Sequence, residues 1–440
     1  MDQHSADSHE AVVGLVVTGD NHLSPALPRL SPVRRRERRA WLQRGFQAAV
    51  DYAIEHHAAL FINTGDLFDS PAPSNQDRAF VATQLKRLSA AGIVCVAISG
   101  NHDTPRMRSE HGGEAPQQVY AALHELHYIA ANETLEPQLL TLNGLRVAIL
   151  GLSNNPVAAP GSDPLAAAHW SDTASAALTE ADVALLILHA AIEGLARPNE
   201  GERTVARASL DALPDDCRLV VAGHIHRFAR QRMGEREVVV VGATERMEFG
   251  AQAGEPGFVW AELTPDGARG VEHIRTQAQP RADITLSADQ LWPENAPATE
   301  SADGEDGEDG EANAALATIR AALADACTPE TMARLRLTGA LSRERYHQLA
   351  LRDVITLGQE IAFSLEVDTT GLTLEERFFA LPTPDARVGA LSPAEALAQV
   401  VEEALREAGN SAPGLPDPAD IRAAGDLLLA RLRMSGEEGA

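Results

Sequence analysis

The 440-residue sequence has little cysteine, little aromatic character and almost no lysine. Its three cysteines, Cys95, Cys217 and Cys327, lie far apart and form no CxxC pair, so there is no disulfide framework and a reducing compartment is indicated. Lys86 is the only lysine, so nearly all basic charge is arginine. No uncharged apolar run reaches the roughly 20 residues of a membrane span, and no basic segment precedes the first apolar run. We therefore expect a cytoplasmic protein without a signal peptide.

Basic charge is also in deficit. The chain has 37 basic and 63 acidic residues, a net charge of −26, which argues against a non-specific nucleic-acid binder. Residues 1–280 hold 24 basic and 34 acidic side chains (net −10), and residues 281–440 hold 13 and 29 (net −16). The acidic excess is thus concentrated in the C-terminal part. Since "RRRERR" (34–39) and the arginines between 227 and 232 form local basic clusters, charge alone leaves the partner open.

Apolar, β-branched runs alternate with helical patterns in the first hundred residues. The runs at 11–19, 58–65 and 93–100 predict buried strands, and the segments 35–57 and 75–91 show helical spacing of apolar residues. This alternation is typical of a parallel α/β sheet. Further strands, with little helix between them, are predicted at 145–152, 182–190, 218–224, 237–243, 257–263 and 270–276. We expect an α/β (α+β) sandwich of two mixed sheets flanked by helices.

Composition divides the chain into four predicted parts, of which residues 1–280 are the two-sheet domain. Residues 281–313 are predicted as an acidic disordered linker, because the segment 293–313 holds eight carboxylates, no basic residue and no large apolar one. An acidic decoy for a basic partner surface is the alternative. Residues 314–390 are predicted as a small α+β domain. Residues 391–440 are predicted as two helices whose apolar faces pack on each other or on a partner helix.

Five predicted strands end in residue types that bind metals. These ends carry Asp20 and His22 (TGDNH), Asp66 and Asp69 (NTGDLFD), Asn101, His102 and Asp103 (GNHD), His189, and His224 and His226 (GHIH). The carboxyl ends of strands are where α/β folds gather ligands and catalytic groups. Alternate residues of an extended segment point to the same side, so each D-x-H or H-x-H pair can face one cavity. Glycines at 19, 65, 100 and 223 precede these residues and permit sharp turns and close approach.

Seven of these residues are candidate metal ligands, more than the three or four that one ion usually takes from a protein. They are Asp20, His22, Asp66, Asn101, His189, His224 and His226. Oxygen and imidazole donors without thiolate favour manganese, with iron or zinc as alternatives, over magnesium or calcium. We expect two divalent ions that share one ligand, and a metal-bridging water or hydroxide as the attacking group. A lone buried histidine is more often a core residue, and His4, His56, His57, His111 and His124 are interpreted in that way.

The ordered set D-x-H, G-D-x-x-D, G-N-H-D, H and G-H-x-H resembles the calcineurin-like metallophosphoesterase family over residues 12–276. The resemblance implies a four-layer sandwich in which Asp66 bridges the two ions. It also implies that His102 faces the scissile phosphate as proton donor or transition-state stabiliser, and that Asp103 orients His102. Asp69 either caps the following segment or contacts substrate.

Longer segments resemble the SbcD group, the nuclease subunit of the bacterial SbcCD double-strand-break repair complex. They are "GDLFDSPAPSNQ" (65–76), "LKRLSAAGIVCVAISGNHD" (85–103) and "VVVVGATERMEFGAQAGEPGFVWAEL" (238–263). Ala243 and Val241 depart from the group's serine and tyrosine, a change we expect to affect packing. The resemblance implies DNA phosphodiester hydrolysis, as exonuclease or endonuclease, in DNA repair and recombination at the nucleoid. It further implies a capping domain, a helix–loop–helix that docks on an SbcC-like coiled-coil ATPase, and a homodimer through the helix at 74–91.

Two other functions stay open from the sequence. The same metal centre could serve a phosphoesterase of small-molecule or protein phosphoesters, which would hydrolyse aryl phosphates without dependence on DNA length. A non-enzymatic scaffold with a residual phosphoesterase domain is disfavoured because the ligand set is intact.

Overall fold

The computed structural model describes six stretches of chain and part of the C-terminal region. They are residues 11–107, 113–130, 134–195, 201–249, 254–292 and 308–374, with the helical residues 397, 400–402, 405–406, 419 and 421–428. The chain divides into two compact units, Met1–Leu374 and Glu375–Ala440. In the second unit, the loop predicted between two helices lies outside the described residues. Among the described residues, no helix has the length and apolar character to span a membrane.

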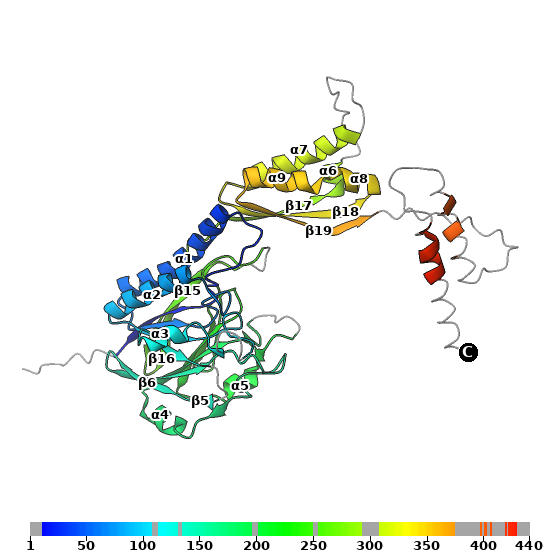
Figure 1. The fold of residues 1–440 in the computed structure, drawn as a ribbon. Helices are drawn as coiled ribbons and strands as arrows, with labels where there is room; N and C mark the ends of the chain where they lie inside the picture. Colours follow the sequence, from blue (N-terminus) through cyan, green and yellow to red (C-terminus); the bar gives the residue numbers. More distant parts are fainter. Residues whose placement is uncertain are drawn as a thin grey trace, which may run out of the picture. The chain divides into compact units, whose positions relative to one another are not determined.

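The first large sheet has the order β16-β15-β1-β2-β3-β4. Its strands are β16 (Gly267–Arg275), β15 (Gly257–Thr264), β1 (Val13–Thr18), β2 (Leu60–Asn63), β3 (Val94–Ile98) and β4 (His127–Ile129). Strands β1 to β4 pair in parallel, whereas β15 pairs antiparallel with both β1 and β16. Helices α1 (Pro32–Glu55) and α2 (Asn75–Ala90) lie side by side on its outer face (Figure 1). Both begin at a serine N-cap, Ser31 and Ser74, whose side chain accepts a first-turn N–H.

The second large sheet has the order β13-β14-β12-β9-β7-β6. Its strands are β13 (Ala229–Met233), β14 (Arg236–Val240), β12 (Cys217–Gly223), β9 (Val183–His189), β7 (Leu145–Leu152) and β6 (Gln138–Leu142). The four central strands are parallel and the two edge strands antiparallel, which confirms the mixed pairing expected. Short helices α3 (Gln118–Ala122), α4 (Ala174–Glu180) and α5 (Arg207–Asp211), and the short pairs β10–β11 (Ala191–Ile192, Thr204–Val205) and β5–β8 (Thr134–Leu135, His169–Trp170), complete the domain.

Three apolar layers separate the sheets and helices. One lies between the two sheets and includes Val17, Ile62, Ile187 and Val221, all fully buried. A second lies between the first sheet and helices α1 and α2, and a third covers the outer face of the second sheet. Full burial of such a side chain contributes about 1.5–3 kcal/mol. The central strands therefore form a rigid base for the loops at their carboxyl ends, and the predicted four-layer α/β sandwich is confirmed.

A smaller subdomain, the capping unit, follows over residues 281–374. It has three parallel strands, β17 (Arg281–Ser287), β18 (Met332–Leu341) and β19 (Ser364–Leu374). Its helices are α6 (Ala288–Leu291), α7 (Glu308–Ala326), α8 (Arg343–Gln348) and α9 (Leu351–Ile361), and α7 and α9 lie side by side over one face of the sheet (Figure 1). The predicted linker 281–313 is therefore wrong at both ends, because its alternating start pairs with β18 and its last residues join α7. Residues 293–307 lie outside the described residues, as does 375–390 of the predicted small domain.

Helix α1 binds the capping unit through the basic cluster "RRRERR". The Arg34 guanidinium donates to the carbonyls of Gln359 (3.1 Å) and Ala362 (2.7 Å), and to that of Phe363. These carbonyls lie at the C-terminal end of α9, where a cation is favoured by the helix dipole. Arg38 is buried and makes a second contact described below. With Arg39, which pairs with Asp77 of α2 at 3.9 Å, three of the five arginines of the cluster thus serve contacts within the chain.

Candidate metal centre

All seven predicted ligands come together where five strands end. Asp20 and His22 follow β1, Asp66 follows β2, and Asn101 follows β3 in the first sheet; His189 ends β9, and His224 and His226 follow β12 in the second. Because these strands are parallel within each sheet, their carboxyl ends meet at one edge of the sandwich. The site therefore draws on both sheets, as the sequence predicted from the strand ends.

One group of side chains gathers around His22. Its Nε2 atom lies 3.1 Å from His226 Nε2, and the two residues are 204 positions apart in the sequence. Asp20, His22 and His226 present ligand atoms that all lie within 4.8 Å of one another. Asp20 also accepts the backbone N–H of His224 at 2.9 Å, which connects the β1 loop to the β12 loop. These three side chains could hold one cation.

A second group gathers around Asn101. Its Oδ1 atom lies 3.0 Å from His189 Nε2 and 3.0 Å from His224 Nδ1. Asp66 lies between the two groups, since its Oδ2 atom is 3.3 Å from His189 Nε2 and 3.8 Å from His22 Nε2. Its other oxygen accepts the backbone N–H of His102 at 2.8 Å. The central position of Asp66 fits the bridging role that the resemblance implies.

The backbone of the site is held in an unusual conformation. Asp20, His22, Asp66 and His224 have φ values of 47°, 44°, 49° and 92°, a region that L-residues with a Cβ seldom adopt. Such strain persists where the surrounding fold enforces it, and it clusters at functional sites. The turn also needs Gly100, because a Cβ there would lie 2.6 Å from both the Cγ and the backbone N of Asp66. Close approach at this glycine, expected from the sequence, is therefore present.

Three ligand histidines have their Nδ1 atom turned to an acceptor. His189 Nδ1 donates to the Thr64 carbonyl at 2.8 Å, His22 Nδ1 lies 3.1 Å from Asp69 Oδ1, and His226 Nδ1 lies 3.1 Å from Glu248 Oε1. Acceptors at Nδ1 favour the tautomer with its proton there, which leaves the Nε2 lone pair free. All three Nε2 atoms point into the site. This oxygen and imidazole donor set, with buried carboxylates, fits divalent cations.

The electrostatics of the site keep its central carboxylate charged. Burial alone would raise the pKa of Asp66, but the neighbouring His189 and His22 lower it below its usual value. Burial lowers the pKa of His189, and Asp66 outweighs it and raises the value to about 9. Burial and the nearby His189 lower the pKa of His224. Asp66 is therefore ionised and His224 neutral near pH 7, the states that metal ligands require, whereas a bound cation would displace the second proton of His189.

Asp103 does not have the role predicted for it. Its fully buried carboxylate accepts the backbone N–H of Gly100 (2.8 Å) and of Phe68 (3.3 Å) and the side-chain N–H of Gln117. Burial and the nearby Asp66 raise its pKa to about 7. These contacts fix the loop between β3 and α3. The prediction that Asp103 orients His102 is therefore wrong, because its oxygens are turned inward to these donors.

The carboxylate beside His102 is that of Asp69. His102 Nδ1 lies 3.4 Å from the Asp69 carbonyl and 3.7 Å from Asp69 Oδ1, while the same Oδ1 contacts His22. The His102 side chain is 43% exposed, more than any ligand histidine, of which His22 and His189 are buried, and its ring meets that of His22 edge-on. His102 is thus accessible to a substrate at the rim of the site. Sequence reasoning missed this role of Asp69, and it missed Thr64 and Glu248.

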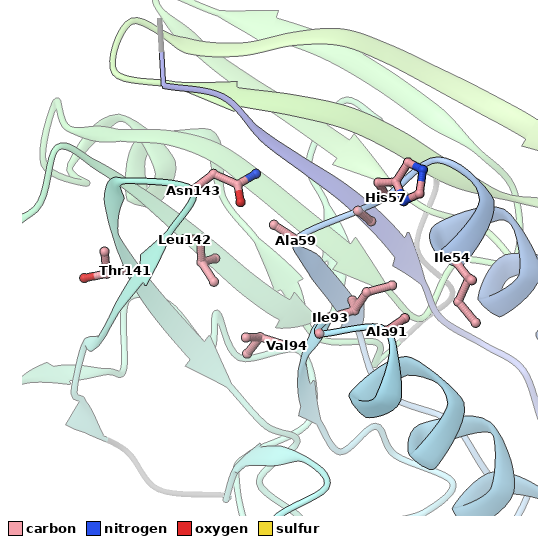
Figure 2. A pocket seen from close by; sticks show the side chains of 11 residues that line it. Ile54, His57, Ala59, Ala91, Ile93, Val94, Thr141, Leu142 and Asn143 are labelled. Carbon is pink, nitrogen blue, oxygen red and sulfur yellow. The ribbon is translucent and has the colours of Figure 1, made fainter. Parts of the chain in front are cut away.

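A cavity among the described residues lies elsewhere. It has a volume of about 570 Å³ and includes Ala59 and Val94, which lie at the amino ends of β2 and β3 (Figure 2). The candidate ligands follow the opposite ends of these strands. Of the side chains that line the cavity, His57 is the one imidazole, and no carboxylate joins it. This cavity is therefore not the candidate site.

Comparison with known proteins places one family match within the two-sheet domain. The family model for the calcineurin-like phosphoesterases matches residues 14–228. The DNA double-strand break repair protein Mre11 of Sulfurisphaera tokodaii is 27% identical over 201 residues, which are 46% of this chain and 47% of that protein. The protein of the same name from Sulfolobus acidocaldarius is 27% identical over 181 residues, 41% of this chain and 42% of that protein. The chain thus spans about half the length of the relatives it matches.

A solved structure of a dimetal phosphatase from Danio rerio is 12% identical to the chain. The likeness covers 58% of this chain and 93% of that one, with a TM-score of 0.36.

Proposed function

Because residues 14–228 form a calcineurin-like phosphoesterase domain, we propose that this chain is a metal-dependent DNA phosphodiesterase. More specifically, we propose that it is the nuclease subunit of an SbcCD-like double-strand-break repair complex. One observation carries the chemistry: the Nε2 atoms of His22 and His189 lie within 4 Å of Asp66 Oδ2, and the exposed His102 stands beside them. The DNA repair proteins matched above support DNA as the substrate class.

The seven ligand residues would hold two divalent ions, and manganese is the metal that their donor atoms favour. Asp20, His22 and His226 would bind one ion, Asn101, His189 and His224 the other, and Asp66 both. When bound, such ions neutralise charge on the phosphate and activate the attacking water. The chain's own contribution is a set of donors fixed by strand ends and by hydrogen bonds at Nδ1. Little reorganisation is then needed as a phosphodiester enters.

His102 would supply the proton in this mechanism. Its Nδ1 atom faces two Asp69 oxygens, which favours a proton on Nδ1 and turns Nε2 toward the exposed rim. In the protonated imidazole, Nε2 would donate its proton to the leaving oxygen as the phosphorus–oxygen bond breaks. Asp69 would stabilise the positive charge on the ring. Asp69 thus has the positioning role that the resemblance assigned to Asp103.

DNA binding must overcome the negative charge of the chain. Arg34 and Arg38 are engaged within the chain, so the remaining arginines supply less positive charge than the sequence suggests. We therefore propose that an SbcC-like coiled-coil ATPase, docked on residues 391–440, provides much of the DNA affinity. The chain would act in the cytoplasm at the nucleoid, as a homodimer through α2. The alternative, a phosphoesterase of small-molecule or protein phosphoesters, would use the same metal centre.

Linear DNA and bis-p-nitrophenyl phosphate, offered in parallel with manganese, test the proposal. Wild type is compared with His102→Ala, and His57→Ala, at the distant cavity, is the matched control. We expect wild type and H57A to cleave DNA, and H102A to lose cleavage while it retains its manganese content. If the small diester is hydrolysed while DNA stays intact, even with an SbcC-type partner present, DNA is not the substrate. If manganese binds and neither substrate reacts, the proposed hydrolase is wrong.

A further inference from the structure

The segment 244–249, "TERMEF", connects the metal centre to the capping unit, and we call it the strap. It follows β14 and lies within the longest stretch that resembles the SbcD group. Its first two residues, Thr244 and Glu245, are buried although both are polar. Buried polar side chains are usually tied to partners, and the partners here lie in two different parts of the chain.

Two strap residues contact the metal centre. Thr244 Oγ1 accepts a hydrogen bond from Asn21 Nδ2 at 2.9 Å, and Asn21 stands between Asp20 and His22. Glu248 Oε1 lies 3.1 Å from Nδ1 of His226. A carboxylate at Nδ1 fixes the tautomer and ring orientation of a metal-binding histidine and raises its basicity. The Glu248 side chain is 54% exposed, so its contact with His226 does not depend on a buried core.

The residues next to these two contact the capping unit and the segment that leads to it. Glu245 pairs with the buried Arg38 at 3.2 Å and accepts the backbone N–H of Gln279. The Gln279 side chain in turn donates to the carbonyl of Glu330, just before β18, at 3.0 Å. Residues 244 and 248 of the strap thus contact the metal centre. Residues 245 and 249 contact the capping unit or the segment that leads to it.

Phe249 is held by two arginines of the capping unit. The guanidinium carbons of Arg281, in β17, and Arg334, in β18, lie 4.8 Å and 5.0 Å from its ring centroid. The Nε and Nη1 atoms of Arg281 are buried without a hydrogen-bond partner among the described residues. The ring face of Phe249 is therefore a favourable contact of that cation, which the strap carboxylates Glu245 and Glu248 also attract. Any shift of β17 and β18 would move Phe249 and, with it, the adjacent Glu248.

We propose that the strap transmits the position of the capping unit to the metal centre, with Glu248 as the positioning residue for His226. The inference rests on the proposed metal centre and goes beyond it, since it makes the metal affinity depend on side chains of the capping unit. Arg334 and Phe249 act on the site through Glu248. None of the three would itself touch a metal or substrate.

Manganese affinity of the full chain, measured by calorimetric titration, tests the inference without reference to turnover. Glu248→Ala should weaken manganese binding by about 10- to 100-fold. Glu248→Gln should restore most of the affinity, because its Oε1 atom can accept the same hydrogen bond. Arg334→Leu should weaken binding in the same direction, by less than E248A. The matched control is Arg336→Leu. Like R334L, it removes one positive charge from β18 and one ion pair of Asp283, but Arg336 is not one of the two arginines that hold Phe249. We expect it to leave the manganese affinity unchanged.

A double variant separates coupling from two independent effects. If the strap transmits the position of the capping unit, E248A combined with R334L should bind manganese no more weakly than E248A alone. Additive losses, equal effects of R334L and R336L, or an unchanged affinity in E248A would each overturn the inference. A wild-type chain that binds no manganese would overturn the metal centre itself, and the inference with it. Circular dichroism confirms that each variant is folded.

Discussion

The Nε2 atoms of His22 and His226 face each other at 3.1 Å. Each ring has its Nδ1 atom beside a carboxylate, Asp69 for His22 and Glu248 for His226. With protons on both Nδ1 atoms, two nitrogen lone pairs would point at one another, an arrangement that a shared cation stabilises and that is otherwise unfavourable. The buried Asp20 and Asp66 carboxylates beside them add to this need for positive charge.

Metal removal should therefore destabilise the fold itself. We expect EDTA to lower the midpoint of thermal unfolding, and added manganese to restore it, because an ion that binds the folded state at 100 times its Kd stabilises it by about 2.7 kcal/mol. Differential scanning fluorimetry of the wild type measures this. Asp66→Asn, which keeps the side-chain shape but loses the charge, should unfold at a midpoint that no longer responds to manganese. An equal manganese response in both proteins would contradict the assignment of Asp66.

Gly100→Ala should disable the site by steric conflict. Its Cβ would lie 2.6 Å from Asp66 Cγ and backbone N, so the Asp66 loop must shift, at a cost of about 1–3 kcal/mol. We expect weaker manganese binding and a lower free energy of unfolding, measured by titration and urea denaturation. Gly92→Asn is the control, because a Cβ at Gly92 meets no atom within 4 Å and asparagine tolerates its left-handed backbone. A G100A chain that binds manganese normally would show that the approach is looser than described.

Substitution of Asp69 should lower turnover, whereas substitution of Asp103 should lower stability. Asp69→Asn weakens the support of His102 and His22, so we expect hydrolysis of bis-p-nitrophenyl phosphate to fall about tenfold or more, with little change in unfolding free energy. The measurement is kcat at saturating manganese, beside urea denaturation. If D69N keeps full activity, the substrate-side role of Asp69 is wrong.

Asp103→Asn should show the opposite pattern. The amide has one acceptor oxygen where the carboxylate offers two, so one buried N–H of Gly100 or Phe68 loses its partner, at about 1–3 kcal/mol. Urea denaturation should detect this loss. Loss of activity without loss of stability would restore the catalytic role first predicted for Asp103.

The candidate ligands could be predicted from sequence because each lies within a few residues of a buried strand. Runs such as 93–100 are interpreted as buried strands. The clustering of metal-binding residue types directly after several such strands then indicates a site. The role of Asp103 could not be predicted in this way. Its partners are backbone N–H groups at 68 and 100 and the side chain of Gln117, which only tertiary packing brings together.

The sequence also did not predict the short strands or the start of the capping unit. The strand β17 precedes a strongly acidic stretch, and composition outweighed its alternating pattern in the prediction of a linker. The short strands β4, β5 and β8 have two or three residues, too few for a periodic signal. Glu248 lies on a segment without regular structure, so no periodicity connects it to His226.

The ion pair between Asp283 and Arg334 should make the stability of the chain depend on acid. Hydrogen bonds from Arg334 lower the pKa of Asp283, although partial burial opposes the shift. An acid whose folded pKa lies below its unfolded value of about 4 stabilises the fold fully above that pH. The contribution is lost as the pH falls through the folded pKa, in the range below about pH 4.

Asp283→Asn should remove this contribution, about 1 kcal/mol at pH 7 for a pair that is partly screened by solvent. Urea denaturation at pH 7 and pH 3 measures the difference, which should be smaller in the variant than in the wild type. Asp325→Asn, an exposed carboxylate of α7, is the control and should leave the pH dependence as it is. If D283N and wild type lose the same free energy between the two pH values, other carboxylates govern the acid stability of the capping unit.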